Sequence, residues 1–421
     1  MKKFLSAALI VGSLLFMPTT QAEVQTYMGN GEYYMSDFET FDVAQKRAKQ
    51  RAEQNACEQA GVFVKSVSRS INSKIVEDEI IAMTSGILKV VDVQFKRENF
   101  YNNTTLIRVT IYANIDSDDV LKWLNKSETE RAELIKQIDD LRRANAAQEK
   151  QIDELKHQLA AATAQQDKDE IAQQFAAEDK IFLSNQKVSE AWQHYYRKDF
   201  GGAIKLHTEA IELNPENALA YYGRAYAYDD LKNYRQAIVD CTKAVQFDSP
   251  RLVDAYNNRG EAYRKSGDYR AAIADYNKAL ELNPNYIRAY NNRGLAYQSL
   301  GNYKQAFADY DKAIKLKPDY ALAYYNRGYA YKKLGQYELA FADYDKAIKL
   351  KPDFAVAYYN RGYANLQLKN YKRAVADFSK YIKLAPDDAD GYTNRGVCYL
   401  ALGDAAKAQA DFDEAKRLGN A

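Results

Sequence analysis

A short polar triplet recurs at a fixed interval in the second half of this chain of 421 residues. Asn-Arg-Gly occurs five times, and each copy begins 34 residues after the last. The copies begin at Asn258, Asn292, Asn326, Asn360 and Asn394. A period of this length is typical of solenoids, in which each supersecondary unit buries its apolar face against the next one. The interval therefore predicts a stack of similar units.

Each unit has the pattern of two helices joined by a turn. Runs with helical spacing, such as the one that ends at Pro318, precede the prolines Pro215, Pro250, Pro284, Pro318, Pro352 and Pro386. An Asn or Asp after the proline, such as Asp319, can cap the next helix. Gly301 and Gly335 each divide their own unit into two helices, because glycine readily takes the left-handed conformation of a helix end. The sequence predicts a mainly α fold of helix-turn-helix units.

Small and aromatic residues keep fixed places within the unit. In one copy these residues are Gly328, Tyr331, Gly335, Tyr337, Ala340, Tyr344, Ala347 and Pro352. With this spacing, residues 187–421 resemble the tetratricopeptide repeat family, in six copies preceded by a degenerate seventh. Asn365, Tyr381 and Ala225 depart from the family pattern, which indicates local packing changes. The resemblance implies a right-handed superhelix whose first helices line a concave groove that holds a peptide or protein segment.

The Arg of the triplet has a carboxylate at a constant distance along the chain. An Asp follows each Arg by 16 residues, as Asp343 follows Arg327. We expect the guanidinium to hold this carboxylate through two hydrogen bonds within one unit. The alternative is a row of Arg side chains that faces the groove. The Gly of the triplet lets the two helices of a unit approach closely.

The Asn of the triplet is the candidate ligand-binding residue. It precedes the Arg by one, so it points about 100° away around the helix axis. In the family that the chain resembles, this place faces the groove, and the amide can bind the backbone of an extended peptide. The resemblance therefore implies a ladder of contacts from Asn258, Asn292, Asn326, Asn360 and Asn394. The alternative is that these amides only cap or solvate the helices.

Aromatic and basic residues flank the Asn row. We predict that they determine ligand specificity and that the groove prefers acidic or aromatic segments. The candidates are Tyr325, Tyr329, Tyr359, Tyr363, Arg264, Lys265, Lys332 and Lys333. Asp229 and Asp230 would make one end of the groove acidic. The alternative is that these charged side chains are simply solvated.

The first 22 residues have the pattern of a secretory signal peptide. Two Lys residues precede an apolar run from Phe4 to Phe16, and a small-residue cleavage site ends at Ala22. We therefore expect an exported protein of the periplasm or cell envelope, without an integral membrane span. Cleavage leaves 57 basic and 57 acidic residues. This balance argues against nucleic acid as a partner.

Residues 23–125 have the pattern of a small α+β domain. We expect a turn at Asn30-Gly31, a helix over 40–60 that Gly61 ends, and a strand over 62–71. A short helix over 77–85, a strand that begins at Val91, a strand over 107–115 and a last helix capped within 116–119 follow. The stretch resembles the N-terminal domains of flagellar assembly protein T and of small envelope lipoproteins, which implies a role in bacterial envelope assembly.

Residues 126–180 form a predicted stalk and spacer. Apolar residues step by four and three along the first half, which is typical of a coiled coil. The seam consists of Leu134, Ile138, Leu141, Ile152, Leu155 and Leu159, with Asn145 at one polar position. We expect a parallel homodimer through residues 130–160. The alternative is a single helix that packs on its own domain. Residues 160–179 are rich in Ala and Gln and are expected to be a helical or frayed spacer.

No pattern indicates an enzyme. His157, His194 and His207 lack the spacing of metal ligands, and no loop has the glycines of a phosphate site. We therefore expect no catalytic residues, no metal and no cofactor, although carboxylates such as Asp37 and Glu39 gather near the N-terminus. The three cysteines are expected to be small buried apolar residues rather than disulfide partners.

The sequence as a whole predicts an exported bacterial scaffold. A protein or peptide segment would bind in the concave groove of the repeats, in a process of cell-envelope assembly. The alternative is a structural envelope protein that associates with itself by stacking its repeats.

Overall fold

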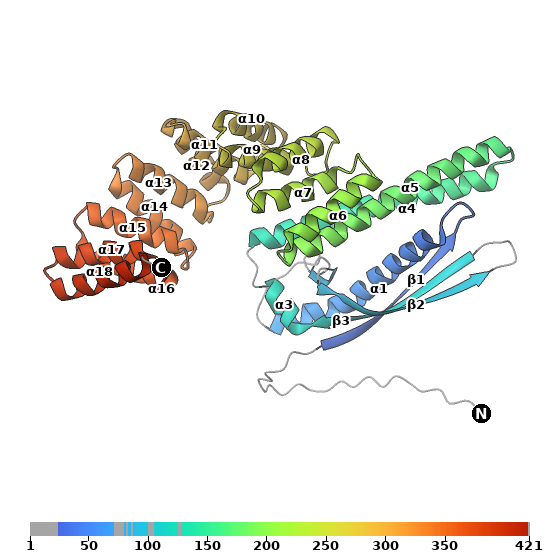
Figure 1. The fold of residues 1–421 in the computed structure, drawn as a ribbon, viewed down its shortest axis with the longest axis horizontal. Helices are drawn as coiled ribbons and strands as arrows, with labels where there is room; N and C mark the ends of the chain where they lie inside the picture. The colour runs from blue at the N-terminus through green and yellow to red at the C-terminus, as the bar shows by residue number, and fades with distance from the viewer. Residues whose placement is uncertain are drawn as a thin grey trace, which may run out of the picture. The chain divides into compact units, whose positions relative to one another are not determined.

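The computed structural model describes residues 24–70, 80, 83–85, 87–99, 105–124 and 128–419. The predicted signal peptide and most of the predicted helix over 77–85 lie outside this range. The chain divides into two compact parts, Met1–Ser189 and Glu190–Ala421, which we call the N-terminal region and the repeat region. The fold is mainly α, with a small sheet in the N-terminal region (Figure 1).

The sheet consists of three antiparallel strands in the order β1-β3-β2. The strands are β1 (Val24–Met35), β2 (Lys89–Asn99) and β3 (Thr105–Asp116). Along β3, Ile107, Val109 and Ile111 are buried on one face and alternate with half-buried polar residues. This alternation confirms the strand predicted over 107–115.

Helix α1 (Phe41–Ser70) packs directly on β1 through its smallest residues. Gly29 and Gly31 face the helix, and a Cβ at these two positions would lie 2.0 Å from the Ala52 carbonyl oxygen and 2.1 Å from that of Ala48. The turn predicted at Asn30-Gly31 is therefore wrong. These glycines lie inside one continuous strand because the helix leaves no room for a side chain.

The same helix overturns two further predictions. Gly61 does not end α1, which continues to Ser70, so residues 62–70 are not a strand. Ala60, Phe63 and Val64 are buried on one side of the helix, which is helical spacing. The last helix of the predicted small domain, α3 (Ser117–Leu124), is confirmed, and the Asp118 N–H donates to Asp116 Oδ1 at its start, 2.8 Å away.

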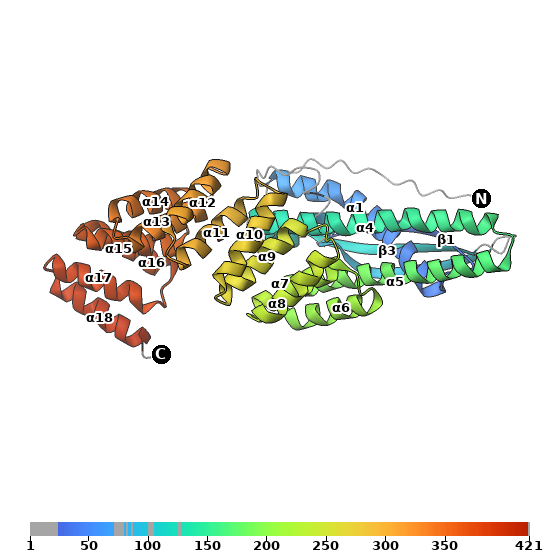
Figure 2. The same ribbon diagram turned by 90° about the horizontal axis from the view of Figure 1, so that it is seen from above.

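The predicted stalk is one arm of a helical hairpin. Helices α4 (Glu128–Ala161) and α5 (Gln165–Tyr196) lie side by side (Figure 2). Ile152 and Leu155 of the heptad seam are buried against Ile171 and Phe175 of α5. This part of the seam is therefore covered within the chain rather than by a second copy. The predicted spacer is the first half of α5.

The repeat region consists of helix pairs joined by short turns. The helices are α6 (Phe200–Leu213), α7 (Ala218–Asp230), α8 (Tyr234–Gln246), α9 (Leu252–Lys265), α10 (Tyr269–Leu282), α11 (Ile287–Ser299), α12 (Tyr303–Leu316), α13 (Ala321–Lys333), α14 (Tyr337–Leu350), α15 (Ala355–Gln367), α16 (Tyr371–Leu384), α17 (Ala389–Ala401) and α18 (Ala405–Gly419). Turn glycines such as Gly301, with φ of +77°, separate the paired helices as predicted. Where the helices cross, a Cβ on Gly294 would lie 2.7 Å from the Tyr310 ring.

Candidate functional site

In each of the six full units, a partly buried Arg forms an ion pair with the buried Asp that follows it by 16 residues. Arg327 on α13 donates from Nε and Nη2 to the two carboxylate oxygens of Asp343 on α14, at 2.8 and 2.6 Å. These hydrogen bonds raise the pKa of Arg327. The same pairing joins Arg224–Asp240, Arg259–Asp275, Arg293–Asp309, Arg361–Asp377 and Arg395–Asp411. The predicted internal pair is confirmed, and the row of groove-facing Arg residues is wrong.

Each Arg also makes a contact that the sequence analysis did not foresee. Arg327 Nη1 donates to Asp311 Oδ1 on α12 of the preceding unit, 2.5 Å away. Arg224, Arg259, Arg293, Arg361 and Arg395 reach Thr208, Thr242, Asn277, Asp345 and Ser379 in the same way. One guanidinium thus joins three helices. The signal in the sequence is a polar acceptor at this place in every unit.

The Asn row makes hydrogen bonds from unit to unit. Asn326 Nδ2 donates to Asn291 Oδ1 at 2.8 Å, and Asn292 Nδ2 donates to Asn257 Oδ1 at 3.3 Å. Asn360 Nδ2 donates to Tyr325 Oη at 3.1 Å. In each case the acceptor belongs to the preceding unit, so the amides hold neighbouring first helices together. Contact of this row with a ligand stays a prediction.

Four of the predicted residues come together with Asn360 on α13 and α15. Lys332 Nζ lies 4.6 Å from the Tyr329 ring centroid and 5.2 Å from that of Tyr363, and it donates to Asn360 Oδ1 at 2.6 Å. Lys333 Nζ lies 5.5 Å from the Tyr329 centroid. We call Tyr329, Lys332, Lys333, Asn360 and Tyr363 the basic aromatic patch. Burial and the nearby Lys333 lower the pKa of Lys332. Neither ammonium has a carboxylate within ion-pair distance among the residues that the structure describes.

The other predicted residues lie outside this patch. The rings of Tyr325 and Tyr359 pack inside their units, and Tyr359 Oη accepts from Asn394 at 3.1 Å. Arg264 and Lys265 pair with Glu261 on α9, and Lys265 also binds Asp229 at 2.6 Å. The basic and acidic residues at this end of the row therefore neutralise one another, which corrects the prediction of an acidic end.

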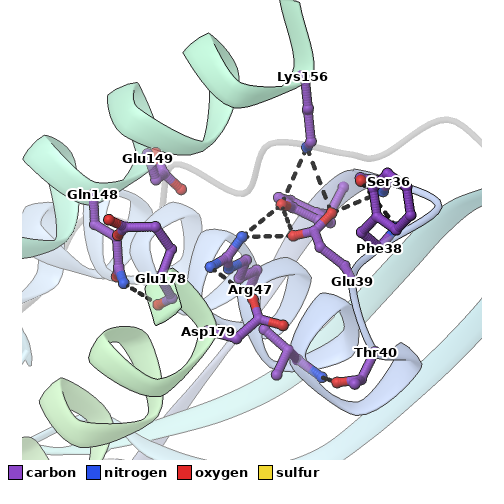
Figure 3. Close-up of polar contacts among 12 residues, drawn as sticks. Ser36, Phe38, Glu39, Thr40, Arg47, Gln148, Glu149, Lys156, Glu178 and Asp179 are labelled. Carbon is purple, nitrogen blue, oxygen red and sulfur yellow. Dashed lines mark hydrogen bonds and ion pairs between the residues drawn. The ribbon is translucent and has the colours of Figure 1, made fainter. Parts of the chain in front are cut away.

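A second polar cluster lies in the N-terminal region (Figure 3). Arg47 on α1 donates from Nη1 to Glu39 Oε1 at 2.5 Å and to Tyr33 Oη at 2.9 Å. Its Nη2 lies 3.2 Å from Asp179 Oδ1 on α5, and Lys156 on α4 donates to Tyr33 Oη at 3.1 Å. Glu39, Arg47 and Asp179 are buried. The cluster connects the sheet, α1 and the helical hairpin, and it gives Glu39 cationic partners.

The raised pKa of Asp179 predicts how the stability of the N-terminal region depends on pH. Burial raises this pKa to about 6, and Glu39 also raises it, whereas Arg47 and the Thr40 N–H lower it. The unfolded value is about 3.9, so the folded state binds more protons between these two values. The contribution of Asp179 to stability should therefore increase, on the order of 2 kcal/mol, as the pH falls from 7 to 4.

Asp179→Asn should remove this pH dependence, while Asp167→Asn, an exposed change on the same helix, should leave it intact. The chain has two Trp residues, so after Trp192→Phe the fluorescence of Trp123 alone reports on unfolding of the N-terminal region. Urea unfolding of such chains by fluorescence measures the effect. Equal pH slopes with and without Asp179 would contradict the prediction.

Clusters of metal ligands, membrane-spanning helices and disulfides are absent from the described residues. No group of three or more His, Cys, Asp or Glu side chains is placed to hold a metal ion within the part of the chain that the structure describes. Among the described helices, none is both long enough and apolar enough to cross a membrane. The cysteines are unpaired, with Cys241 and Cys398 buried and Cys57 partly buried.

Comparisons with known proteins agree with the geometry of the repeats. Family profiles described as "TPR repeat" match residues 260–301 and 299–335. Profiles described as "Tetratricopeptide repeat" match residues 218–249, 321–354, 355–388 and 378–410. Serine/threonine-protein phosphatase 5 of Rattus norvegicus is 36% identical over 72 residues, and the translocon at the outer membrane of chloroplasts 64 of Pisum sativum is 42% identical over 71 residues. These segments are 17% of this chain and only 14% and 12% of the two relatives.

Solved structures match part of the chain. A tetratricopeptide repeat protein from Parabacteroides merdae is 23% identical and covers 56% of this chain and 93% of its own, with a TM-score of 0.46. MamA is 27% identical and covers 38% of this chain and 94% of its own, with a TM-score of 0.36. YrrB, described as a TPR protein with an unusual peptide-binding site, is 26% identical and covers 41% of this chain and 88% of its own, with a TM-score of 0.35.

Proposed function

We propose that this chain holds a segment of a partner protein against the first helices of its repeat units. The repeat region belongs to the tetratricopeptide repeat family, whose units form protein-interaction scaffolds. The first helices are α7, α9, α11, α13, α15 and α17. The observation that carries the proposal is the basic aromatic patch, where two ammonium groups lie beside two Tyr rings without a carboxylate partner in the described structure.

The chemistry of the patch favours an acidic segment. Lys332 is partly buried and its pKa is lowered, so a carboxylate from a partner would supply the counter-charge that the chain itself does not provide. The Tyr rings offer apolar area together with hydroxyl groups, a combination that is enriched in protein interfaces. An extended segment with acidic side chains near an apolar one fits both properties.

The Asn row would then have two roles. All five amides donate to the preceding unit and hold neighbouring first helices in place. Asn326 and Asn360 are buried, whereas Asn258, Asn292 and Asn394 are only half-buried. The exposed parts of these three amides would contact the backbone of the partner.

We propose that the scaffold lies outside the cytoplasm. The support for this is the signal-peptide pattern of residues 1–22, together with the resemblance of the following stretch to domains of envelope proteins. The process is then the assembly of a component of the cell envelope. Fractionation of cells that express the full chain tests this part, and a chain that keeps residues 1–22 and stays in the cytoplasm would contradict it.

Cross-linking in intact cells tests the binding proposal. A photoreactive aromatic residue at Tyr329, which lies in the patch beside Lys332 and Lys333, should capture the partner, which mass spectrometry identifies. Lys332→Glu/Lys333→Glu should lower the captured amount at least tenfold, because the reversed charges repel an acidic segment. Lys312→Glu/Lys346→Glu changes two exposed lysines on the second helices and is the matched control.

Two outcomes would decide against the proposal. Equal capture with and without the charge reversal would show that the patch does not bind the partner. A second copy of this chain as the only captured protein would instead favour a structural protein that associates through its repeats.

A further inference from the structure

A cavity of about 90 Å³ opens between α7, α8 and α9 in the repeat region. This is several times the roughly 10–15 Å³ that one water molecule needs by the same measure. Its apolar lining includes Ala225, Ala237 and Cys241, and its polar lining includes Asp229 and Glu261. The cavity is separate from the basic aromatic patch on α13 and α15.

The cavity exists because one unit lacks an aromatic ring that the later units have. Cys241 is the residue that follows the ion-paired Asp240, and the corresponding places hold Tyr276, Tyr310, Tyr344, Phe378 and Phe412. In those units the ring packs on the Gly of the triplet, as Tyr310 packs on Gly294. In this unit Ala225 stands in place of the Gly. Its methyl group fills only a small part of the space that an aromatic ring fills in the later units.

The unit also lacks the hydroxyl group that goes with such a ring. Tyr310 Oη donates to Gln298 Oε1 at 3.0 Å, and Gln298 lies 12 residues before Tyr310. Asp229 holds the same place relative to Cys241. Its Oδ2 accepts from Lys265 at 2.6 Å, but its Oδ1 is buried and has no hydrogen-bond donor among the described residues.

We propose that this cavity takes the side chain of a tyrosine from the partner segment, with its ring over Cys241 and its hydroxyl group donating to Asp229 Oδ1. The inference rests on the proposed function in so far as the tyrosine belongs to a segment held by the first helices. Tyr226, which also lines the cavity, supplies an aromatic wall and is itself held by Trp192, with ring centroids 5.8 Å apart. Such aromatic pairs favour offset or edge-on packing.

The charges around the cavity favour a neutral donor over a cationic side chain. Lys265 already pairs with both Asp229 and Glu261, at 2.6 and 3.1 Å. Arg288 also lines the cavity. A lysine or arginine would add a third positive charge here, whereas a phenol supplies one hydrogen bond and no charge.

The test uses p-cresol as the probe, with toluene as the probe that lacks the hydroxyl group. Ligand-observed NMR titrations on the full chain measure both dissociation constants. We expect p-cresol to bind at least fivefold more tightly than toluene. Asp229→Leu should abolish this preference and leave toluene binding unchanged. Leu holds the corresponding place in two later units, as Leu366 and Leu400.

The matched variant fills the cavity from within. Ala225→Gly/Cys241→Tyr recreates the packing of Gly294 and Tyr310, so it should fold, as circular dichroism would verify, and it should weaken p-cresol binding at least tenfold. Unchanged binding in this double variant, or equal affinity of the wild-type chain for both probes, would overturn the inference. Should the double variant not fold, Asp229→Leu still decides.

The same variants separate this inference from the proposed function. Capture of a partner at position 329 that is equal for the wild-type chain and the folded double variant would overturn the tyrosine pocket and leave the scaffold proposal in place. Binding of p-cresol with the expected preference, combined with no captured partner at all, would support the pocket and contradict the scaffold proposal.

Discussion

Replacing Arg327 by Met is expected to destabilise the repeat region by about 3–5 kcal/mol, because it leaves a buried carboxylate without its counter-charge. Asp343 is 6% exposed, and both of its carboxylate oxygens accept from this guanidinium. The change also removes the contact with Asp311 in the preceding unit. Since units of a solenoid contact only their neighbours, the loss should be greatest in α12, α13 and α14. Hydrogen exchange measured helix by helix would detect this.

The control for this prediction removes both charges. Arg327→Met/Asp343→Leu should be clearly more stable than Arg327→Met alone, because well-packed apolar residues often replace a buried ion pair without loss. Lys349→Ala removes a pair with Asp345 in which Lys349 is 71% exposed, and it should cost no more than about 1 kcal/mol. If the single and double changes at Arg327 cost the same, the uncompensated charge is not the cause.

Gly31→Ala is expected to destabilise the N-terminal region by about 3 kcal/mol, the upper part of the usual range for overpacking. The added Cβ would lie 2.1 Å from the Ala48 carbonyl oxygen and 2.6 Å from the Ala52 nitrogen. Both are backbone atoms of α1, which cannot turn aside as a flexible side chain can. The helix must therefore move away from the sheet and lose apolar contact with β3. Urea unfolding followed by Trp123 fluorescence, in a chain with Trp192→Phe, measures the loss.

The neighbouring residue provides the control for the glycine. Asn30 lies on the opposite, exposed face of β1, so Asn30→Ala should cost no more than about 1 kcal/mol, the usual value of one hydrogen bond. A Gly31→Ala chain as stable as the Asn30→Ala chain would show that α1 does not press on the strand.

The fold of the repeat region was predictable because its sequence pattern is periodic. The interval of 34 residues, the turn glycines and the spacing of Arg327 and Asp343 are each repeated, so a chance pattern in one unit is corrected by the next. The bonds between units were missed for the opposite reason. The acceptor of the third Arg contact changes from Thr to Asn, Asp and Ser, which hides a constant role behind different residue types.

The sequence patterns of the N-terminal region occur only once, and several of them are compatible with two different structures. Glycine permits a tight turn, but it also permits a helix to pack against a strand, as at Gly31. A heptad seam shows that a helix has an apolar face, but it does not show what covers Ile152 and Leu155. Arg47 and Asp179 are 132 residues apart, so no local pattern could have indicated their ion pair.

The reach of each Arg has a consequence for how such a chain can change length over generations. Arg327 bonds to a residue 16 positions before it and to one 16 positions after it. Because the units from Arg259 to Arg395 follow one another at intervals of 34 residues, an in-frame duplication or deletion of 34 residues among them would keep each Arg 16 residues before an Asp. The gene could therefore lengthen or shorten this part of the scaffold in single steps that preserve the ion pairs within the units.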